Sequence, residues 1–99
     1  MKPAKLKKRL TCDLQTVLKT PQGRRVLWQI LQAAQVRQHG FISGDSLATA
    51  FHCGQRSIGL YLLDEIEQAM PGAYQQMRGE YIAEVTSLQN QLSEENLND

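Results

Sequence analysis

The sequence has few of the residues on which enzymes, disulfide-rich proteins and membrane proteins depend. Only two of its 99 residues are cysteine and two are histidine. Cys12 and Cys53 show no Cys-x-x-Cys spacing, so the sequence predicts no disulfide framework and no redox or zinc motif. No apolar run approaches the roughly 18 residues of a membrane-spanning helix, and no signal-peptide pattern is found. We expect the chain to stay in the cytoplasm of the cell that makes it.

The residues that could support catalysis are badly arranged for it. His52 directly precedes Cys53, and neighbours on a helix point about 100° apart. Glycines five apart, Gly54 and Gly59, suggest a phosphate loop, but Leu60-Tyr61 stand where that loop requires Lys-Ser/Thr. We therefore expect no enzyme activity, no cofactor and no metal site. We expect the two cysteines to be small buried residues, and the two histidines, His39 and His52, to lie at the surface.

Apolar residues recur at helical spacing throughout, and no sustained period-two run is found, which predicts an all-α fold of about four helices. Thr11 is expected to cap the first helix. Thr20-Pro21 should end it and begin the second, which should stop at His39-Gly40. Asp45 or Ser46 should cap a long helix, or two abutting ones, over residues 47–70, and Pro71 should open the last. The sequence divides the chain into an N-terminal arm (1–10), a helical domain (11–82), and an acidic C-terminal helix extension and tail (83–99). We expect the last helix to fray from residue 93.

The predicted second helix carries an apolar stripe whose members should face the core: Val26, Leu27, Ile30, Leu31 and Ala34. Trp28 lies about a quarter turn off this stripe, so it is either the edge of the core or an exposed interface anchor. In the third helix the expected core positions are Leu47, Phe51, Ile58, Leu62, Ile66 and Ala69. Gly54 and Gly59 suggest a bend there, or the close approach of another helix.

Three arginines need an explanation. Arg24 and Arg25 lie in the first turns of a helix, where the helix dipole does not favour a cation. They either contact phosphate or an acidic partner, or are solvated or paired within the chain. Arg56 either covers the surface or pairs with an acid such as Asp13 or Asp64.

The C-terminal helix carries a narrow apolar seam that needs a second helix to cover it. Its spacing of three and four residues is that of a coiled coil, over Tyr74, Met77, Tyr81, Val85, Leu88 and Leu92. Either an earlier helix of the chain covers the first half, or the part beyond Ile82 projects and packs against another molecule.

Charge is divided between the two ends of the chain. Residues 80–99 hold five acids and no base. Residues 1–10 hold five cations and no acid: Lys2, Lys5, Lys7, Lys8 and Arg9. This basic arm can bind DNA phosphates with salt-dependent, sequence-independent affinity, or it is a solvated tail that aids solubility. It has no aromatic residue, which gives no support to single-strand recognition.

Four stretches carry a resemblance to a known family: Leu14-Gln-Thr-Val-Leu18, Thr20-Pro-Gln-Gly-Arg-Arg-Val-Leu-Trp-Gln-Ile-Leu31, Gly54-Gln-Arg-Ser-Ile-Gly-Leu-Tyr-Leu-Leu63 and Pro71-Gly-Ala-Tyr74. Over about residues 11–78 the chain resembles a family of small proteins of tailed phages and prophages, typified by a Bordetella podovirus protein (Bbp19-like). The matching signature positions are Gly23, Arg24, Trp28, Gly54, Arg56, Gly59 and Leu60. The family does not say whether they serve the fold or a partner.

The resemblance implies a phage gene, often near those for portal and capsid, and a minor virion or assembly component, with no established activity. Our leading hypothesis is a non-enzymatic virion protein, made in the host bacterial cytoplasm and present in multiple copies. It would dock on portal, capsid or tail proteins and touch packaged DNA through its arm. The alternatives are a helix-turn-helix regulator and an early, host-directed inhibitor. Against the regulator, the connection from His39 to Asp45 is longer than the usual turn of about 3–4 residues, and the next helix offers few base-reading side chains.

Overall fold

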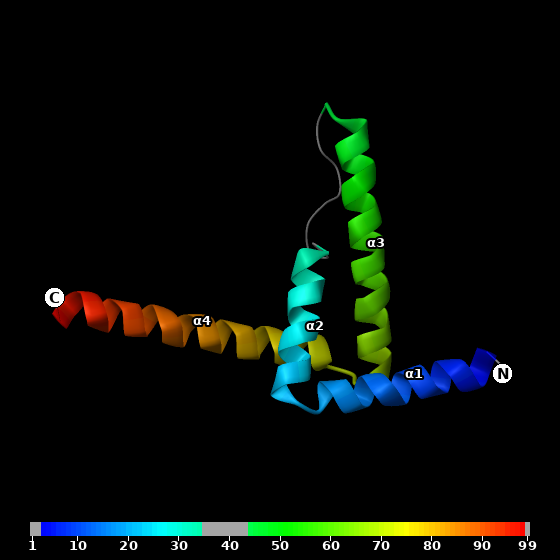
Figure 1. Ribbon diagram of the computed structural model, residues 1–99, viewed down its shortest axis with the longest axis horizontal. Coiled ribbons are helices and arrows are strands. Elements are labelled where there is room, and N and C mark those ends of the chain that lie inside the picture. The colour runs from blue at the N-terminus through cyan, green and yellow to red at the C-terminus, as the bar shows by residue number, and fades with distance from the viewer. Residues whose placement is uncertain (1–2, 35–43, 99) are drawn as a thin grey trace.

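The computed structural model describes residues 3–34 and 44–98, which form four helices and no strand. These are α1 (Pro3–Leu18), α2 (Pro21–Ala33), α3 (Ser46–Ala69) and α4 (Ala73–Asn98). α2 and α3 run side by side, while α1 and α4 extend from their base to opposite sides (Figure 1). The all-α prediction is confirmed. With extents of 63 × 43 × 17 Å and a radius of gyration of 17.6 Å, the chain is flatter and more extended than the ~13 Å typical of 100 residues.

α1 begins eight residues before the predicted start, so the basic segment is helical. Residues 4–10 are good helix formers without glycine or proline, which lets the helix extend outward from the core. Thr11 is not a cap: its hydroxyl donates to the Lys7 carbonyl at 3.0 Å, the bond of a mid-helix threonine. At the other end, Gln15 Nε2 donates to the Ala69 carbonyl at 3.0 Å and attaches α1 to the end of α3.

The corner between α1 and α2 is the one the sequence predicts. Thr20 caps α2 by accepting from the Gly23 amide at 3.0 Å, and Pro21 takes the first turn. Gly23 packs directly on the end of α1: a methyl group there would overlap the Val17 carbonyl oxygen and lie 2.9 Å from Val17 Cγ1. α2 ends at Ala33, before the predicted end at His39-Gly40, which lies outside the described residues.

α3 is one continuous helix capped by Asp45, whose carboxylate accepts from the Ala48 amide at 2.8 Å. Pro71 does not open α4 as predicted, because it lies with Gly72 in the turn before it; Gly72 has φ +87°. Glu67 caps α4 from outside, accepting from the Gly72 and Tyr74 amides at 2.9 and 2.8 Å. α4 continues to Asn98, so the predicted fraying from residue 93 is not seen.

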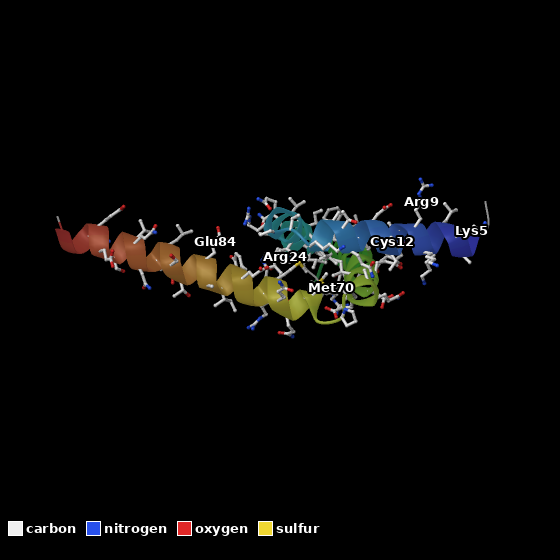
Figure 2. The ribbon with its side chains drawn as sticks, turned by 90° about the horizontal axis from the view of Figure 1, so that it is seen from below. Lys5, Arg9, Cys12, Arg24, Met70 and Glu84 are labelled. Atoms are coloured by element: carbon white, nitrogen blue, oxygen red, sulfur yellow. The ribbon has the colours of Figure 1, made fainter. Side chains whose placement is uncertain are left out.

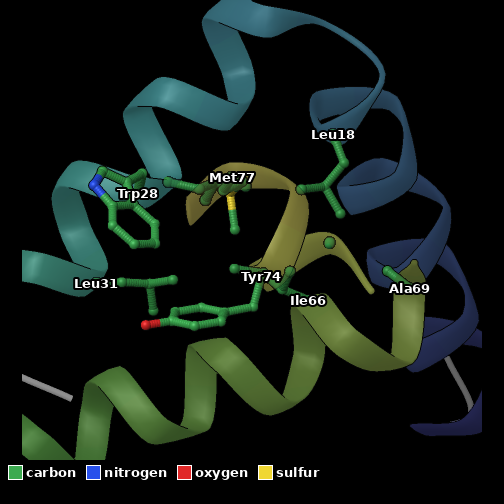
Figure 3. Packing of buried hydrophobic residues seen from close by; sticks show 9 residues of the cluster. Leu18, Trp28, Leu31, Ile66, Ala69, Tyr74 and Met77 are labelled. Atoms are coloured by element: carbon green, nitrogen blue, oxygen red, sulfur yellow. The ribbon is translucent and has the colours of Figure 1, made fainter. Parts of the chain in front are cut away.

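The core is small and lies where the four helices meet (Figure 3). Ile66 is fully buried, but the first half of α3 does not reach the core: Leu47, Phe51 and Ile58 are 83%, 65% and 69% exposed, contrary to prediction. The predicted stripe of α2 is also rotated, since Val26 and Ile30 are exposed and Trp28 is buried in their place. The full set of buried residues is Leu18, Leu27, Trp28, Leu31, Ile66, Ala69, Ala73, Tyr74 and Met77.

Candidate functional site

A groove of about 420 Å³ separates the outer side of α2 from the first half of α4. α2 contributes Pro21, Arg24, Arg25, Trp28 and Gln29, and α4 contributes Met77, Glu80, Tyr81, Glu84, Val85 and Leu88. Its walls are mainly apolar, with charged side chains along its edges. Such a surface suits an apolar helix or segment of another protein better than a charged small molecule.

Trp28 forms the floor of this groove and is held between two tyrosines of α4. Its ring centroid lies 5.5 Å from that of Tyr74 and 5.4 Å from that of Tyr81, both rings being tilted. Tyr74 and Tyr81 are seven residues apart and share one face of α4. With 7% exposure, Trp28 belongs to the edge of the core rather than being a free anchor. Its indole Nε1 is buried and has no hydrogen-bond acceptor among the residues that the structure describes.

Arg24 is paired within the chain. Nε donates to Glu80 Oε1 at 2.9 Å, Nη2 to Oε2 at 2.9 Å, and Nη1 to the Leu18 carbonyl at 2.8 Å (labelled in Figure 2). One guanidinium thereby joins the end of α1, the start of α2 and the α4 wall of the groove. Arg25, in contrast, is exposed on the groove edge.

Replacing Arg24 with alanine should lower the free energy of unfolding by about 1–3 kcal/mol, because both the carboxylate pair and the Leu18 bond are lost. Glu80→Ala should cost less, about 1 kcal/mol, since Glu80 is 42% exposed. Urea denaturation of both single variants and the double variant gives the coupling energy. Arg25→Ala is the matched control, and an equal cost for it and Arg24→Ala would contradict this role.

The α4 side of the groove carries the seam outward from the core to Leu92, which lies beyond the groove. Tyr81, Leu88 and Leu92 are 47%, 53% and 59% exposed, and Val85 is half-buried. Of the six seam residues, Tyr74 and Met77 are buried in the core. Earlier helices therefore cover the start of the seam, as the first alternative predicts, and the part beyond Ile82 projects; its packing against another molecule stays a prediction.

The cations of the basic segment surround the free end of α1. Lys5, Lys7, Lys8 and Arg9 are all exposed, while Lys2 lies outside the described residues. Leu6 and Leu10 are also exposed, at 49% and 43%. Figure 2 shows Lys5 and Arg9 at the opposite end of the molecule from the projecting part of α4.

The second group of signature residues lies along α3 and does not line the groove. A methyl group added at Gly54 would have no described atom within 4 Å, so none of the four helices approaches it, whereas Gly59 is buried. Leu60 is 37% exposed. Arg56 is half-buried, its Nε has no hydrogen-bond partner among the described residues, and it forms no ion pair with Asp13 or Asp64.

Cysteine and histidine do not form a site in the described part of the chain. Cys12 and Cys53 are both exposed, contrary to the expectation that they are buried, because each lies on a helix face turned from the core. His52 is half-buried with its ring edge-on to Phe51, and His39 is outside the described residues. Within residues 3–34 and 44–98, no group of three or more His, Cys, Asp or Glu side chains is placed to hold a metal ion. No helix in those ranges is long and apolar enough to cross a membrane.

A family model of Bbp19-like phage proteins matches residues 14–78. The chain belongs to this family. No curated protein and no solved structure matches it significantly. The Bbp19-like region contains Arg24, Trp28 and Met77 but ends before Glu80, so residues beyond it complete the groove and pair with the signature arginine.

Two of these contacts have no signal in the sequence. Arg24 and Glu80 are 56 positions apart, and no local pattern connects them. Glu67, which caps α4, is an ordinary helical glutamate by sequence. Trp28 and the Tyr81–Leu88 part of the seam are recognisable separately, and the structure brings them into one groove.

Proposed function

We propose that this Bbp19-like phage protein is a non-enzymatic minor virion or assembly protein that docks on portal, capsid or tail proteins. The observation that carries the proposal is the uncovered apolar surface formed by the groove and by the α4 seam. A contiguous apolar surface with charged edges is typical of a protein-binding site. The protein is made in the host cytoplasm and ends in the particle, where several copies let weak contacts add.

Purified particles test this proposal. Quantitative mass spectrometry should find the protein at a fixed ratio to the portal or major capsid protein. Particles from cells in which the gene carries Val85→Glu in the α4 seam should lose it. Ile58→Glu, at an exposed apolar position on α3 outside the groove, is the matched control and should be retained. Absence of the wild-type protein from particles would overturn the proposal and favour a regulator or a host-directed inhibitor.

The proposal includes contact of the basic turns of α1 with packaged DNA. Lys5→Glu with Lys8→Glu should weaken binding to double-stranded DNA at low salt and reduce the slope of log K against log salt by about 2, since each lost phosphate contact removes about 0.9. Fluorescence anisotropy over a salt series measures both. The matched control is Lys19→Glu with Arg78→Glu, which changes the net charge by the same amount at exposed positions outside the basic turns of α1. Equal losses for the two double variants would remove α1 from the contact.

A further inference from the structure

Two exposed apolar stripes lie at opposite ends of this chain, one on a basic helix segment and the other on an acidic one. On α1, Leu6, Leu10 and Val17 are 49%, 43% and 40% exposed and fall on one face, because they are four and seven residues apart. On α4 the second stripe is the exposed seam described above: Tyr81, Val85, Leu88 and Leu92. Each stripe is narrow and at helical spacing, as in a pair of helices that pack along a seam.

The charges beside the stripes are complementary. At about 100° per residue, Lys7 and Arg9 fall on the two edges of the Leu6–Leu10 stripe, whereas Glu84 and Glu95 fall along one edge of the α4 seam. All four side chains are exposed. Opposite charges at such flanking positions select the partner and orientation of paired helices.

The two stripes of one molecule do not meet. α1 carries its basic end away from the core on one side, and α4 carries its acidic end away on the other, as Figures 1 and 2 both show. In both views the helices run from N- to C-terminus in the same general direction. A second copy displaced along that direction would bring its α1 beside the α4 of the first.

Pairing of α4 with α4 is disfavoured, because residues 80–99 carry five acids and no base, and Glu84 and Glu95 would face like charges. We propose that copies of this chain associate head to tail, the basic half of α1 in one copy packing on the acidic seam of α4 in the next. The interface is heterologous, so repetition gives a ring or an open chain rather than a closed dimer. The proposal names a second copy of this chain as the partner of the α4 seam, and it rests on the proposed function only in taking that seam as a protein-binding surface.

The arrangement leaves part of the basic helix available. Lys5 and Lys8 lie on the side of α1 away from the Leu6–Leu10 stripe. They can contact phosphate while the stripe is covered by the neighbouring copy. Protein and DNA contacts would then use opposite faces of the same two helical turns.

Two variants, each removing one of the two surfaces, test the proposal with purified full-length protein alone. Leu10→Glu destroys the α1 stripe and leaves the α4 seam intact, whereas Leu88→Glu does the reverse. Both positions are about half exposed, at 43% and 53%, and circular dichroism checks that both variants fold. Wild-type protein should sediment as concentration-dependent oligomers, and each variant alone as the 11.2 kDa monomer.

The deciding sample is the equimolar mixture of the two variants. Leu10→Glu still offers α4 and Leu88→Glu still offers α1, so the mixture should form one heterologous contact and sediment as a 1:1 complex. The emission of Trp28, the single tryptophan, gives a second reading because it lies in the groove beside Tyr81. The control variant Ile58→Glu should form the same oligomers as the wild-type protein.

Three results would overturn the proposal, and none of them bears on incorporation into particles. The first is a wild-type chain that stays monomeric at several hundred micromolar in low salt. The second is a mixture that remains monomeric. The third is a Leu10→Glu variant that still dimerises while Leu88→Glu does not, which would assign the α4 seam to a symmetric dimer.

Discussion

Gly23→Ala is expected to destabilise the protein by about 2–3 kcal/mol, although alanine is normally the better helix former by about 1 kcal/mol. The added methyl group would overlap the Val17 carbonyl oxygen and lie 2.8 Å from the carbonyl carbon. These are backbone atoms at the end of α1, so no side-chain rotation relieves the overlap, and the α1–α2 corner must open. Thermal unfolding followed by circular dichroism should show a decrease in Tm of roughly 10–20 °C.

Gly54→Ala is the matched control for this substitution. Gly54 lies inside α3 and has no described atom within 4 Å of the position a methyl group would take. The ordinary gain in helix propensity should therefore appear, up to about 1 kcal/mol of added stability. If the two variants changed Tm in the same direction, the close approach of α1 and α2 at Gly23 would be wrong.

Ile66→Ala should cost about 2–5 kcal/mol, enough to leave much of the protein unfolded at 37 °C. Ile66 is fully buried among residues of all four helices, and truncation leaves a cavity that this small core cannot easily fill. Urea denaturation followed by far-ultraviolet circular dichroism gives the change in free energy. The midpoint should shift with little change in slope if the native state keeps its extent.

Ile58→Ala makes the same truncation on the same helix, about two turns earlier, where the side chain is 69% exposed. We expect a change within about 0.5 kcal/mol. Equal losses at Ile58 and Ile66 would mean that the first half of α3 is buried, contrary to the structure.

Local signals in the sequence predict the fold where local chemistry decides it. The Thr20 cap with Pro21 and the Asp45 cap are set by residues within one turn, and both predictions are confirmed. Thr11 gives a wrong start for α1, because a threonine that bonds its own helix has the same sequence appearance as a cap. The role predicted for Pro71 is wrong because Gly72, at φ +87°, separates the proline from the helix, so that α4 begins only at Ala73. Glu67 satisfies the Gly72 and Tyr74 amides at this end of α4.

The sequence predicts the parts of the site but not their assembly. The α4 seam and Trp28 can both be identified, yet whether Trp28 faces inward depends on Tyr74 and Tyr81 meeting it. Pairing within the chain is one of the alternatives open to Arg24 by sequence, and the choice of Glu80 rests on how α2 crosses α4, which no short-range pattern encodes. The apolar spacing of α3 predicts burial along its whole length, but its first half extends past the small core.

The attachment of α1 to the body bears on the curvature of any assembly of this protein. Gln15 holds α1 to the end of α3, and Arg24 holds the Leu18 carbonyl of α1 to α2 and α4. Because both projecting helices are continuous from the core outward, the angle between them is fixed there rather than at a loop. A small change in packing at the Gly23 corner would therefore change the angle between α1 and α4, and the resulting displacement grows over the 63 Å length of the molecule. In a ring of head-to-tail copies, that angle sets the number of subunits.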